Sequence, residues 1–162
     1  MRMTNKIYPR GTRVVGVILS KDKERIILIE RHKNGRHYYV FPGGGLENSD
    51  KTERDALLRE IKEETNTLVK IIGQPYKLKI KGHSKQIFYI CQHLGGVPLV
   101  VGEERKRQNK NDQYIAKWIP VEKLTQKKAY PLEVRDWLLK DLKNNRWQKR
   151  TLTLSSFDSL KS

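Results

Sequence analysis

The stretch FPGGGLENSDKTERDALLREIKEETN, residues 41–66, places three consecutive glycines directly before a segment rich in carboxylates. The chain as a whole is strongly basic, with 34 lysines and arginines against 18 aspartates and glutamates. It nevertheless keeps Glu60, Glu63 and Glu64 within five consecutive positions. The physical reason for this acidic cluster is the question on which the function depends.

The segment after the glycines has the features of an amphipathic helix. TERD, residues 52–55, fits a capping box, in which the Thr52 hydroxyl and the Asp55 carboxylate bond exposed backbone amides at the start of a helix. Good helix formers continue to about Thr65. At about 100° per residue, the glutamates of the cluster fall within an arc of roughly 100° on one side of this helix. The adjoining arc is expected to pack against a sheet and holds Leu57, Leu58 and Ile61.

Carboxylates at this spacing repel one another, and the repulsion increases when they are partly buried. A hard divalent cation removes that cost, because Mg²⁺ prefers carboxylate oxygens and keeps several of its waters. Glycines add a complementary feature, since Gly43 to Gly45 can bring backbone carbonyls or amides close to a metal ion or a phosphate. Without the glycines, a solvated helix face partnered by Arg59 and Lys62 is the simpler interpretation. Together, the two features favour a metal site that binds phosphate.

With these residues in place, the stretch resembles the signature of the Nudix hydrolases, G-x5-E-x7-R-E-U-x-E-E-x-G-U, in which U is a bulky aliphatic residue. When Gly45 is taken as the first glycine, the frame spans residues 45–67, and YYVFPGGGLE is similar to the family's usual strand-to-loop entry. The resemblance implies an α/β (α+β) fold in which a mixed β-sheet is sandwiched between α-helices. It also implies hydrolysis, dependent on Mg²⁺ or Mn²⁺, of a nucleoside diphosphate linked to another moiety.

Carried over residue by residue, the resemblance implies a set of site residues. The metal-binding and catalytic acids are Glu60, Glu63 and Glu64. Arg59 belongs to the catalytic set as the residue that orients these acids. The glycines Gly43, Gly44 and Gly45 approach the cofactor, and a carbonyl of Gly44 or Gly45 serves as the backbone ligand. The resemblance does not single out one general base.

Two positions depart from the signature. Lys51 stands where the family has its first glutamate, which usually pairs with the arginine of the signature. Either Asp50 or Glu53 is therefore expected to pair with Arg59, or the loop carries one extra residue. Asn66 replaces the final glycine, and asparagine is the next best residue for a left-handed helix end. Neither departure removes an expected metal ligand.

Family members often place a further ligand or the base in the loop before the tryptophan-bearing strand, and GGGLE offers another acid nearby. The candidates are Glu47, Glu103, Glu104 and Asp112. Stacking on a nucleotide base is open to four aromatic residues, most of which are expected in the core: Tyr39, Phe88, Tyr114 and Trp118. His83 and His93 are interpreted as strand or turn residues.

Outside this stretch, the sequence predicts strands interleaved with two helices. TRVVGVILS and RIILIER are predicted to form a hairpin, and a second turn at Asn34-Gly35 leads to the strand YYVF. YKLKIKG and KQIFYICQHL are further strands, YIAKWIPVEKL is a strand that runs into a turn, and PLEVRDWLLKDLK is an amphipathic helix. We expect a single domain over residues 1–144, followed by a basic, polar, frayed tail over residues 145–162.

Composition limits the class of protein. The longest apolar run, VVGVILS, is too short to cross a bilayer, no signal peptide is evident, and Cys91 has no second cysteine to pair with. We therefore expect a cytoplasmic protein with no membrane partner. The formal net charge of +16 attracts polyanions without selecting one of them, and a nucleotide-type small molecule, the expected substrate, would profit from the same field.

Two alternatives to that substrate stay open. One is the 5′ end of RNA, with help from the basic loop around Arg105 to Lys110. The other is a non-catalytic nucleotide- or RNA-binding module that keeps the fold. Many relatives pair, so the sequence is also compatible with a homodimer.

Overall fold

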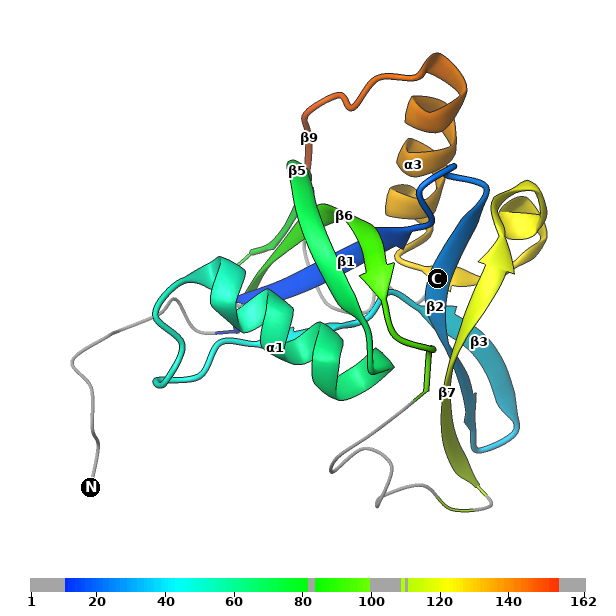
Figure 1. The fold of residues 1–162 in the computed structure, drawn as a ribbon, viewed down its shortest axis with the longest axis horizontal. Coiled ribbons are helices and arrows are strands. Elements are labelled where there is room, and N and C mark those ends of the chain that lie inside the picture. The colour runs from blue at the N-terminus through cyan, green and yellow to red at the C-terminus, as the bar shows by residue number, and fades with distance from the viewer. Residues whose placement is uncertain (1–10, 82–83, 100–108, 110, 155–162) are drawn as a thin grey trace.

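The structure is a computed structural model, and it describes residues 11–81, 84–99, 109 and 111–154. Within these ranges a nine-stranded mixed sheet lies between two α-helices (Figure 1), which confirms the expected α/β (α+β) fold class. The strands are β1 (Arg13–Leu19), β2 (Arg25–Lys33), β3 (Arg36–Val40), β4 (Gly43–Gly45), β5 (Leu68–Ile80), β6 (Ser84–Gly95), β7 (Asp112–Pro120), β8 (Ala129–Tyr130) and β9 (Arg150–Leu154). The helices are α1 (Glu53–Thr65), the 3-10 helix η1 (Val121–Gln126) and α3 (Leu132–Asn144).

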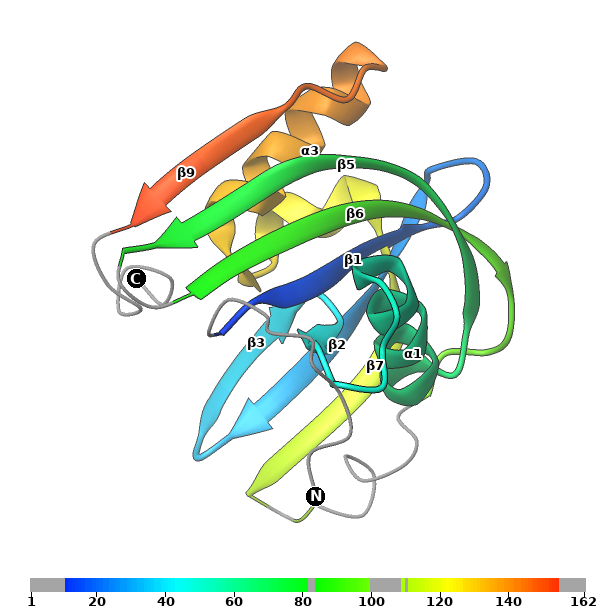
Figure 2. The same ribbon diagram turned by 90° about the vertical axis from the view of Figure 1, so that its left-hand side faces the viewer.

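The main path of the sheet runs β8-β3-β2-β1-β6-β5-β9, with β4 paired to β1 and β7 paired to β2. The pairs β1–β6, β3–β8 and β5–β9 are parallel, and the other pairs are antiparallel. The β5–β6 pair contains register shifts between Ile71 and Tyr76. Such irregularities bend a strand, and Figure 2 shows β5 and β6 curving together around the molecule.

Local sequence accounts for the predicted hairpin between β2 and β3. Asn34 and Gly35 have positive φ angles of 50° and 81°, as both central residues of a type I′ turn require. The turn fixes the register, so that Glu30 lies opposite Tyr39 and His32 lies opposite His37. This register decides which side chains of the hairpin share a face.

Helix α1 begins and ends where the sequence predicts. The Thr52 hydroxyl accepts a hydrogen bond from the Asp55 N–H at 3.0 Å, as an N-cap residue should. Asn66 follows the helix in a left-handed conformation, with φ at 59°. The interpretation of Asn66 as a substitute for glycine is therefore confirmed. No helix in the described part of the chain is long and apolar enough to cross a membrane.

The two α-helices cover opposite faces of the sheet, and each closes its own apolar core. The core under α1 includes Val14, Ile27, Leu57, Ile61 and Ile87. The core under α3 includes Val17, Leu28, Phe88, Val134 and Leu138. The prediction that Leu58 packs against the sheet is wrong, since its side chain is 42% exposed. On the helix, Leu58 lies beyond the edge of the face that Leu57 and Ile61 bury.

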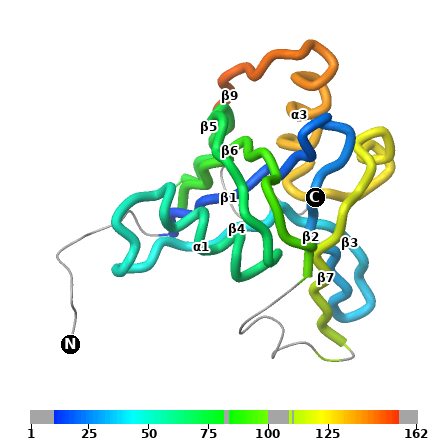
Figure 3. Tube along the Cα trace, in the orientation of Figure 1, coloured from blue at the N-terminus to red at the C-terminus, as the bar shows by residue number. Residues whose placement is uncertain are grey.

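Strand β1 changes its partner along its length. Its first residues pair with β4, where Val15 lies opposite Gly43, and its last residues pair with β2, where Ile18 lies opposite Ile27. Between them the Gly16 N–H donates to the Pro42 carbonyl at 2.8 Å. β4 therefore lies beside β1 and α1 (Figure 3), while β2 diverges toward β3 and β7. This divergence makes room for a cavity between the two groups of elements.

The expectation of a frayed tail after residue 144 is wrong for residues 150–154. These residues form β9, which pairs in parallel with β5 along the edge of the sheet (Figure 2). Arg150 holds this strand to the core, because its Nη2 donates to the buried Asp141 carboxylate at 2.8 Å. The Tyr76 hydroxyl donates to the same carboxylate at 2.6 Å. The division of the chain at residue 144 itself stays a prediction.

Candidate functional site

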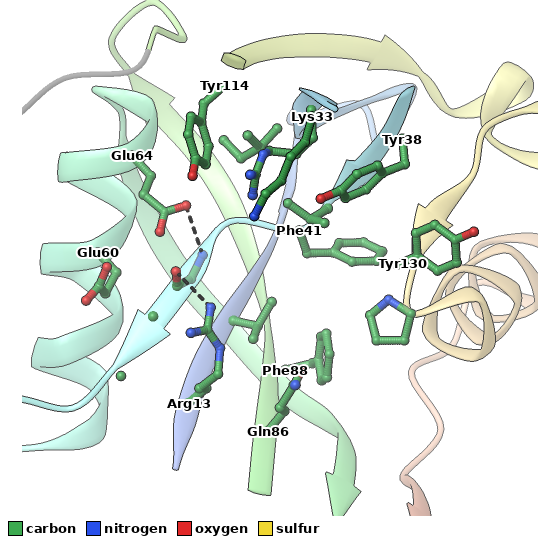
Figure 4. A pocket seen from close by; sticks show the side chains of 18 of the residues that line it. Arg13, Lys33, Tyr38, Phe41, Glu60, Glu64, Gln86, Phe88, Tyr114 and Tyr130 are labelled. Carbon is green, nitrogen blue, oxygen red and sulfur yellow. Dashed lines mark hydrogen bonds between the residues drawn. The ribbon is translucent and has the colours of Figure 1, made fainter. Parts of the chain in front are cut away.

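A cavity of about 780 Å³ opens between α1 and β4 on one side and β2, β3 and β7 on the other. Its volume lies within the range of about 300–1,000 Å³ that small-molecule sites usually occupy. Figure 4 shows Glu60 and Glu64 on one wall, and Lys33, Tyr38 and Tyr130 across from them. The site is therefore acidic on one wall and basic and aromatic on the other.

Helix α1 and the glycine strand β4 form the acidic wall. Glu60 and Glu64 lie one turn apart on α1, and Glu64 accepts a hydrogen bond from the Gly43 N–H, with 3.4 Å between N and Oε2. The Glu60 carboxylate lies so close to Gly44 that a Cβ at this position would overlap it. A Cβ at Gly43 would instead overlap the backbone carbonyl of Val14. The missing side chains thus allow the backbone of β4 to approach both β1 and the carboxylates.

Arg59 connects the carboxylates of the acidic wall to the loop before α1. Its Nε and Nη2 donate to the two oxygens of the Asp50 carboxylate at 3.0 and 2.8 Å. Its Nη1 donates to Glu60 at 2.9 Å and to Glu63 at 3.4 Å. The planar guanidinium therefore fixes the acids relative to the loop, as a bidentate arginine can.

The pair between Arg59 and Asp50 explains how the chain tolerates Lys51 in the signature. Asp50 is buried, and its Oδ2 also accepts a hydrogen bond from the Glu47 N–H at 2.8 Å. Glu53, the other candidate partner, accepts a hydrogen bond from a tyrosine of β6 instead. The prediction that Asp50 or Glu53 replaces the missing glutamate is therefore confirmed for Asp50.

The electrostatic environment of Glu60 differs from that of a surface glutamate. Burial raises the pKa of the Glu60 carboxyl, and the neighbouring Glu63 carboxylate raises it further. The positive charges of Arg59 and Arg13 partly counteract this rise in the pKa. A partly buried carboxylate that remains costly to ionise despite two arginines is a group that a bound cation would stabilise.

The opposite wall is basic and aromatic. Its cationic residues are Arg31, Lys33 and Arg36, while Arg13 lines the cavity from β1 beside the glycine strand. The Arg31 guanidinium stacks on the Tyr114 ring, 3.7 Å from its centroid, and pairs with Asp112 at 3.1 Å. Tyr38 and Tyr130 meet edge to face, with 6.0 Å between their ring centroids. These groups offer positive charge for phosphates and flat faces for a base.

Of the acids suggested for a further ligand, Glu47 and Asp112 are among the described residues, and neither lines the cavity, although Glu47 shares Arg59 with Glu60 and Glu63. Glu47 is exposed, with its Oε1 3.3 Å from Arg59, and does not line the cavity. Asp112 pairs with Arg31 on β2. His93 contacts the Gly96 carbonyl through Nε2, as a strand-end residue can. Glu103, Glu104 and His83 lie outside the described residues.

Of the aromatic residues suggested for stacking, Phe88 and Tyr114 line the cavity, whereas Tyr39 and Trp118 do not. Sequence reasoning missed Phe41, Tyr38 and Tyr130, and it also missed the cationic wall. The available signal was alternation, because Arg31 and Lys33 are two residues apart on β2 and therefore share a face. The turn at Asn34 and Gly35 then places β3 beside them.

The donor set of the acidic wall fits a hard divalent cation. Glu60 and Glu64 line the cavity, whereas Glu63 lies beside Glu60 at the Arg59 guanidinium and is not part of the lining. The partial burial of a negative charge at Glu60 favours a counter-charge there. Arg59 provides part of that charge in the structure. Among the described residues, the one group of three ligands with all ligand atoms within 4.8 Å of one another lies elsewhere, at Glu30, His32 and His37. The glutamates of α1 are therefore less closely gathered than that group.

Sequence comparison decides the family. The NUDIX domain matches residues 10–140, which is most of the chain. The chain belongs to the NUDIX family. The expectation of a Nudix hydrolase is confirmed at the level of the family, whose hydrolases generally need a divalent metal ion. The sequence matches none of the curated proteins.

Solved structures confirm the fold of this NUDIX domain. A NUDIX hydrolase from Nitrosomonas europaea is similar with a TM-score of 0.67 at 11% identity, over 93% of this chain and 82% of that one. An ADP-ribose pyrophosphatase from Streptococcus suis is similar with a TM-score of 0.59 at 19% identity, over 86% and 97% of the two chains. MutT, from a study of the Aliivibrio salmonicida and Vibrio cholerae proteins, is similar with a TM-score of 0.56 at 19% identity, over 81% and 93%.

Proposed function

We propose that this NUDIX domain is a metal-dependent pyrophosphohydrolase. It cleaves the phosphate–phosphate bond of a nucleoside diphosphate linked to another moiety, as in a nucleoside triphosphate or a nucleotide sugar. The observation that carries the proposal is the cavity with the Glu60 and Glu64 carboxylates on one wall and cationic and aromatic side chains on the other. A polyphosphate that carries a base has the chemistry to bridge these two walls.

In this proposal the acidic wall holds the metal. Glu60, Glu63 and Glu64, together with the Gly45 carbonyl, bind Mg²⁺ or Mn²⁺. The bound ion neutralises phosphate charge and lowers the pKa of a bound water. Arg59, itself held by Asp50, keeps Glu60 and Glu63 in position.

The glycine strand and the basic wall then bind the rest of the substrate. Gly43 and Gly44 leave the backbone of β4 open to a phosphate, because no side chain covers it. Arg13 lies beside this strand, with its Nη2 3.4 Å from the Gly43 carbonyl, and Lys33 faces it from β2 (Figure 4). These cations hold the charged phosphates, while Tyr38 and Tyr114 supply faces on which a base stacks. The fold similarity to an ADP-ribose pyrophosphatase supports a nucleotide sugar as one member of the substrate class.

A second candidate substrate is the 5′ end of RNA. The cavity is lined by four cationic side chains against two carboxylates, an excess of positive charge that a longer polyanion would use. The basic loop suggested for this role falls mostly on residues outside the described ranges. A non-catalytic sensor has less use for the partly buried Glu60 carboxylate beside Glu63 and Glu64. We further propose that the protein is cytoplasmic. The homodimer is tested by measuring the molecular mass of the protein in solution.

The test is release of phosphate or nucleotide with Mg²⁺ from a panel of substrates: dNTPs, ADP-ribose, dinucleoside polyphosphates and 5′-triphosphorylated RNA. Glu63→Gln and Glu64→Gln are assayed alongside, with Glu122→Gln on η1 as a matched control away from the cavity. We expect metal-dependent cleavage between phosphates that falls at least about 100-fold in both site variants and is unchanged in the control. Preference for RNA would favour the second candidate. Absence of turnover across the panel, or equal activity in the site variants, contradicts the proposal.

A further inference from the structure

A second group of metal-ligating side chains lies on the face of the β2–β3 hairpin that points away from the cavity. Ile29 and Arg31 of β2 line the cavity, so the alternating residues Glu30 and His32 face the other way. His37 lies directly opposite His32 on β3. The ligand atoms of Glu30, His32 and His37 all lie within 4.8 Å of one another. This group takes no part in the proposed hydrolysis.

The ligand atoms of the group lie close enough together to share one transition-metal ion. The His32 and His37 rings are stacked, with 4.3 Å between their centroids and 6° between their planes. The Glu30 Oε2 lies 2.7 Å from the His37 Nε2 and 3.7 Å from the His32 Nε2. A tetrahedral ion with bonds of about 2.0–2.1 Å separates its ligand atoms by about 3.4 Å. One observed separation is shorter and the other longer than that distance, so an ion would bind as the stacked imidazoles turn out of their parallel arrangement toward it.

Neighbouring side chains hold the Glu30 carboxylate in place and in its charged form. The Tyr39 hydroxyl donates to Oε2 at 3.0 Å, and the Lys117 ammonium donates to Oε1 at 3.0 Å. Such outer partners are the usual support of a metal-binding carboxylate. The imidazoles remain about half exposed, at 43% and 50%, so an ion can reach them from solvent.

We propose that Glu30, His32 and His37 form a binding site for a divalent transition-metal ion such as Zn²⁺. Two imidazole nitrogens and one carboxylate oxygen suit Zn²⁺, Co²⁺ and Ni²⁺, whereas Mg²⁺ prefers oxygen ligands alone. Water completes the coordination. The bound ion joins β2 to β3 next to the Asn34–Gly35 turn, and it therefore braces the hairpin whose other face lines the cavity. The proposal does not depend on the hydrolytic function.

The test is calorimetric titration of the full chain, free of any affinity tag, with ZnCl₂ in a buffer that contains excess Mg²⁺. Co²⁺ provides a second readout, because its visible absorption reports coordination by nitrogen ligands. His32→Ala and His37→Ala remove one ligand each at partly exposed positions. His93→Ala, on β6, is the matched control, and Glu63→Gln reports any binding of the ion to the acidic wall.

We expect one Zn²⁺ per chain, with affinity at least about 10-fold weaker in His32→Ala and His37→Ala and unchanged in His93→Ala and Glu63→Gln. Zinc is also expected to raise the melting temperature of the unaltered chain but not that of the two histidine variants. His37→Gln keeps a polar side chain on β3 and replaces His37→Ala if circular dichroism shows that the alanine disturbs the fold. Absence of zinc binding to the unaltered chain, equal binding by the histidine variants, or loss of binding in Glu63→Gln overturns the proposal.

Discussion

The substitution Asp50→Asn tests the support that this chain uses in place of the signature's first glutamate. Asp50 is 5% exposed at its side chain and receives two hydrogen bonds from Arg59, at 3.0 and 2.8 Å. It also receives one from the Glu47 N–H at 2.8 Å. An asparagine keeps one acceptor oxygen but turns its amide N–H₂ toward a donor. The change therefore removes the negative charge and leaves at least one buried donor without an acceptor.

The expected loss follows from these contacts. A hydrogen bond to a charged group contributes about 1.5–3 kcal/mol, and breaking a fully buried ion pair costs about 3–5 kcal/mol. Arg59 is 22% exposed and keeps its hydrogen bond to Glu60, which places the effect toward the lower range. We expect unfolding free energy to fall by about 2–3 kcal/mol. For a domain of this size that corresponds to a drop in melting temperature of about 4–12 °C.

Thermal unfolding followed by circular dichroism measures this change. Glu53→Gln is the matched control, because Glu53 was the other candidate partner and instead bonds a tyrosine of β6; it is expected to cost under about 1 kcal/mol. Lys51→Glu restores the residue of the signature. It is expected to leave stability nearly unchanged, because Arg59 already donates two hydrogen bonds to Asp50. A melting temperature of Asp50→Asn equal to that of Glu53→Gln would refute the assignment of Asp50.

Three further predictions concern other parts of the structure. Gly44→Ala inserts a Cβ into the space of the Glu60 carboxylate, so metal-dependent hydrolysis is expected to fall at least about 100-fold while circular dichroism stays native; unchanged activity contradicts the close approach. Glu60 has a raised pKa in the fold, so its ionisation destabilises the fold as the pH rises above the unfolded pKa, and fully once the pH exceeds the folded pKa. Glu60→Gln should therefore raise the melting temperature of metal-free protein at neutral pH, and this gain should disappear below the unfolded pKa. Truncation before Arg150 removes the counter-charge of the buried Asp141, whose pKa is lowered by hydrogen bonds from Tyr76 and Arg150 despite its burial. The free energy of unfolding, measured in urea, should fall by about 3–5 kcal/mol, and an unchanged value would show that residues after 149 do not stabilise the fold.

The acidic wall could be predicted from the sequence because one continuous segment encodes it. Thr52, the helix formers after it and Asn66 define where α1 begins and ends, and helix geometry then places the glutamates on one side. Gly43 and Gly44 stand a short distance before the helix and need no long-range information to be recognised. Spacing in the sequence left two acids, Asp50 and Glu53, as possible partners of Arg59. The conformation of the loop before α1 shows that Asp50 is the partner.

The basic wall could not be predicted in the same way, because its residues come from separate strands. Arg31 is on β2, Arg36 is on β3 and Tyr130 is on β8, and only the strand order brings them together. Strand β9 was missed for a related reason. RTLTL is short and lies in a polar, basic stretch, and its place in the sheet depends on pairing with β5 and on the contact between Arg150 and Asp141.

Because β1 pairs first with β4 and then with β2, the two walls of the cavity belong to different segments of the chain. The sequence of one segment can change while the other stays the same. Residues 43–64 carry the acids, whereas residues 31–38 carry most of the cations and a stacking tyrosine. Residues 31–38 of the β2–β3 hairpin pair with neither β4 nor α1, so exchange of this outer part of the hairpin leaves the pairing of β4 with β1 in place. We therefore expect that a graft of this hairpin from a relative changes which substrates are bound. The hydrolysis of the phosphate–phosphate bond, which depends on the glutamates of α1, is expected to persist.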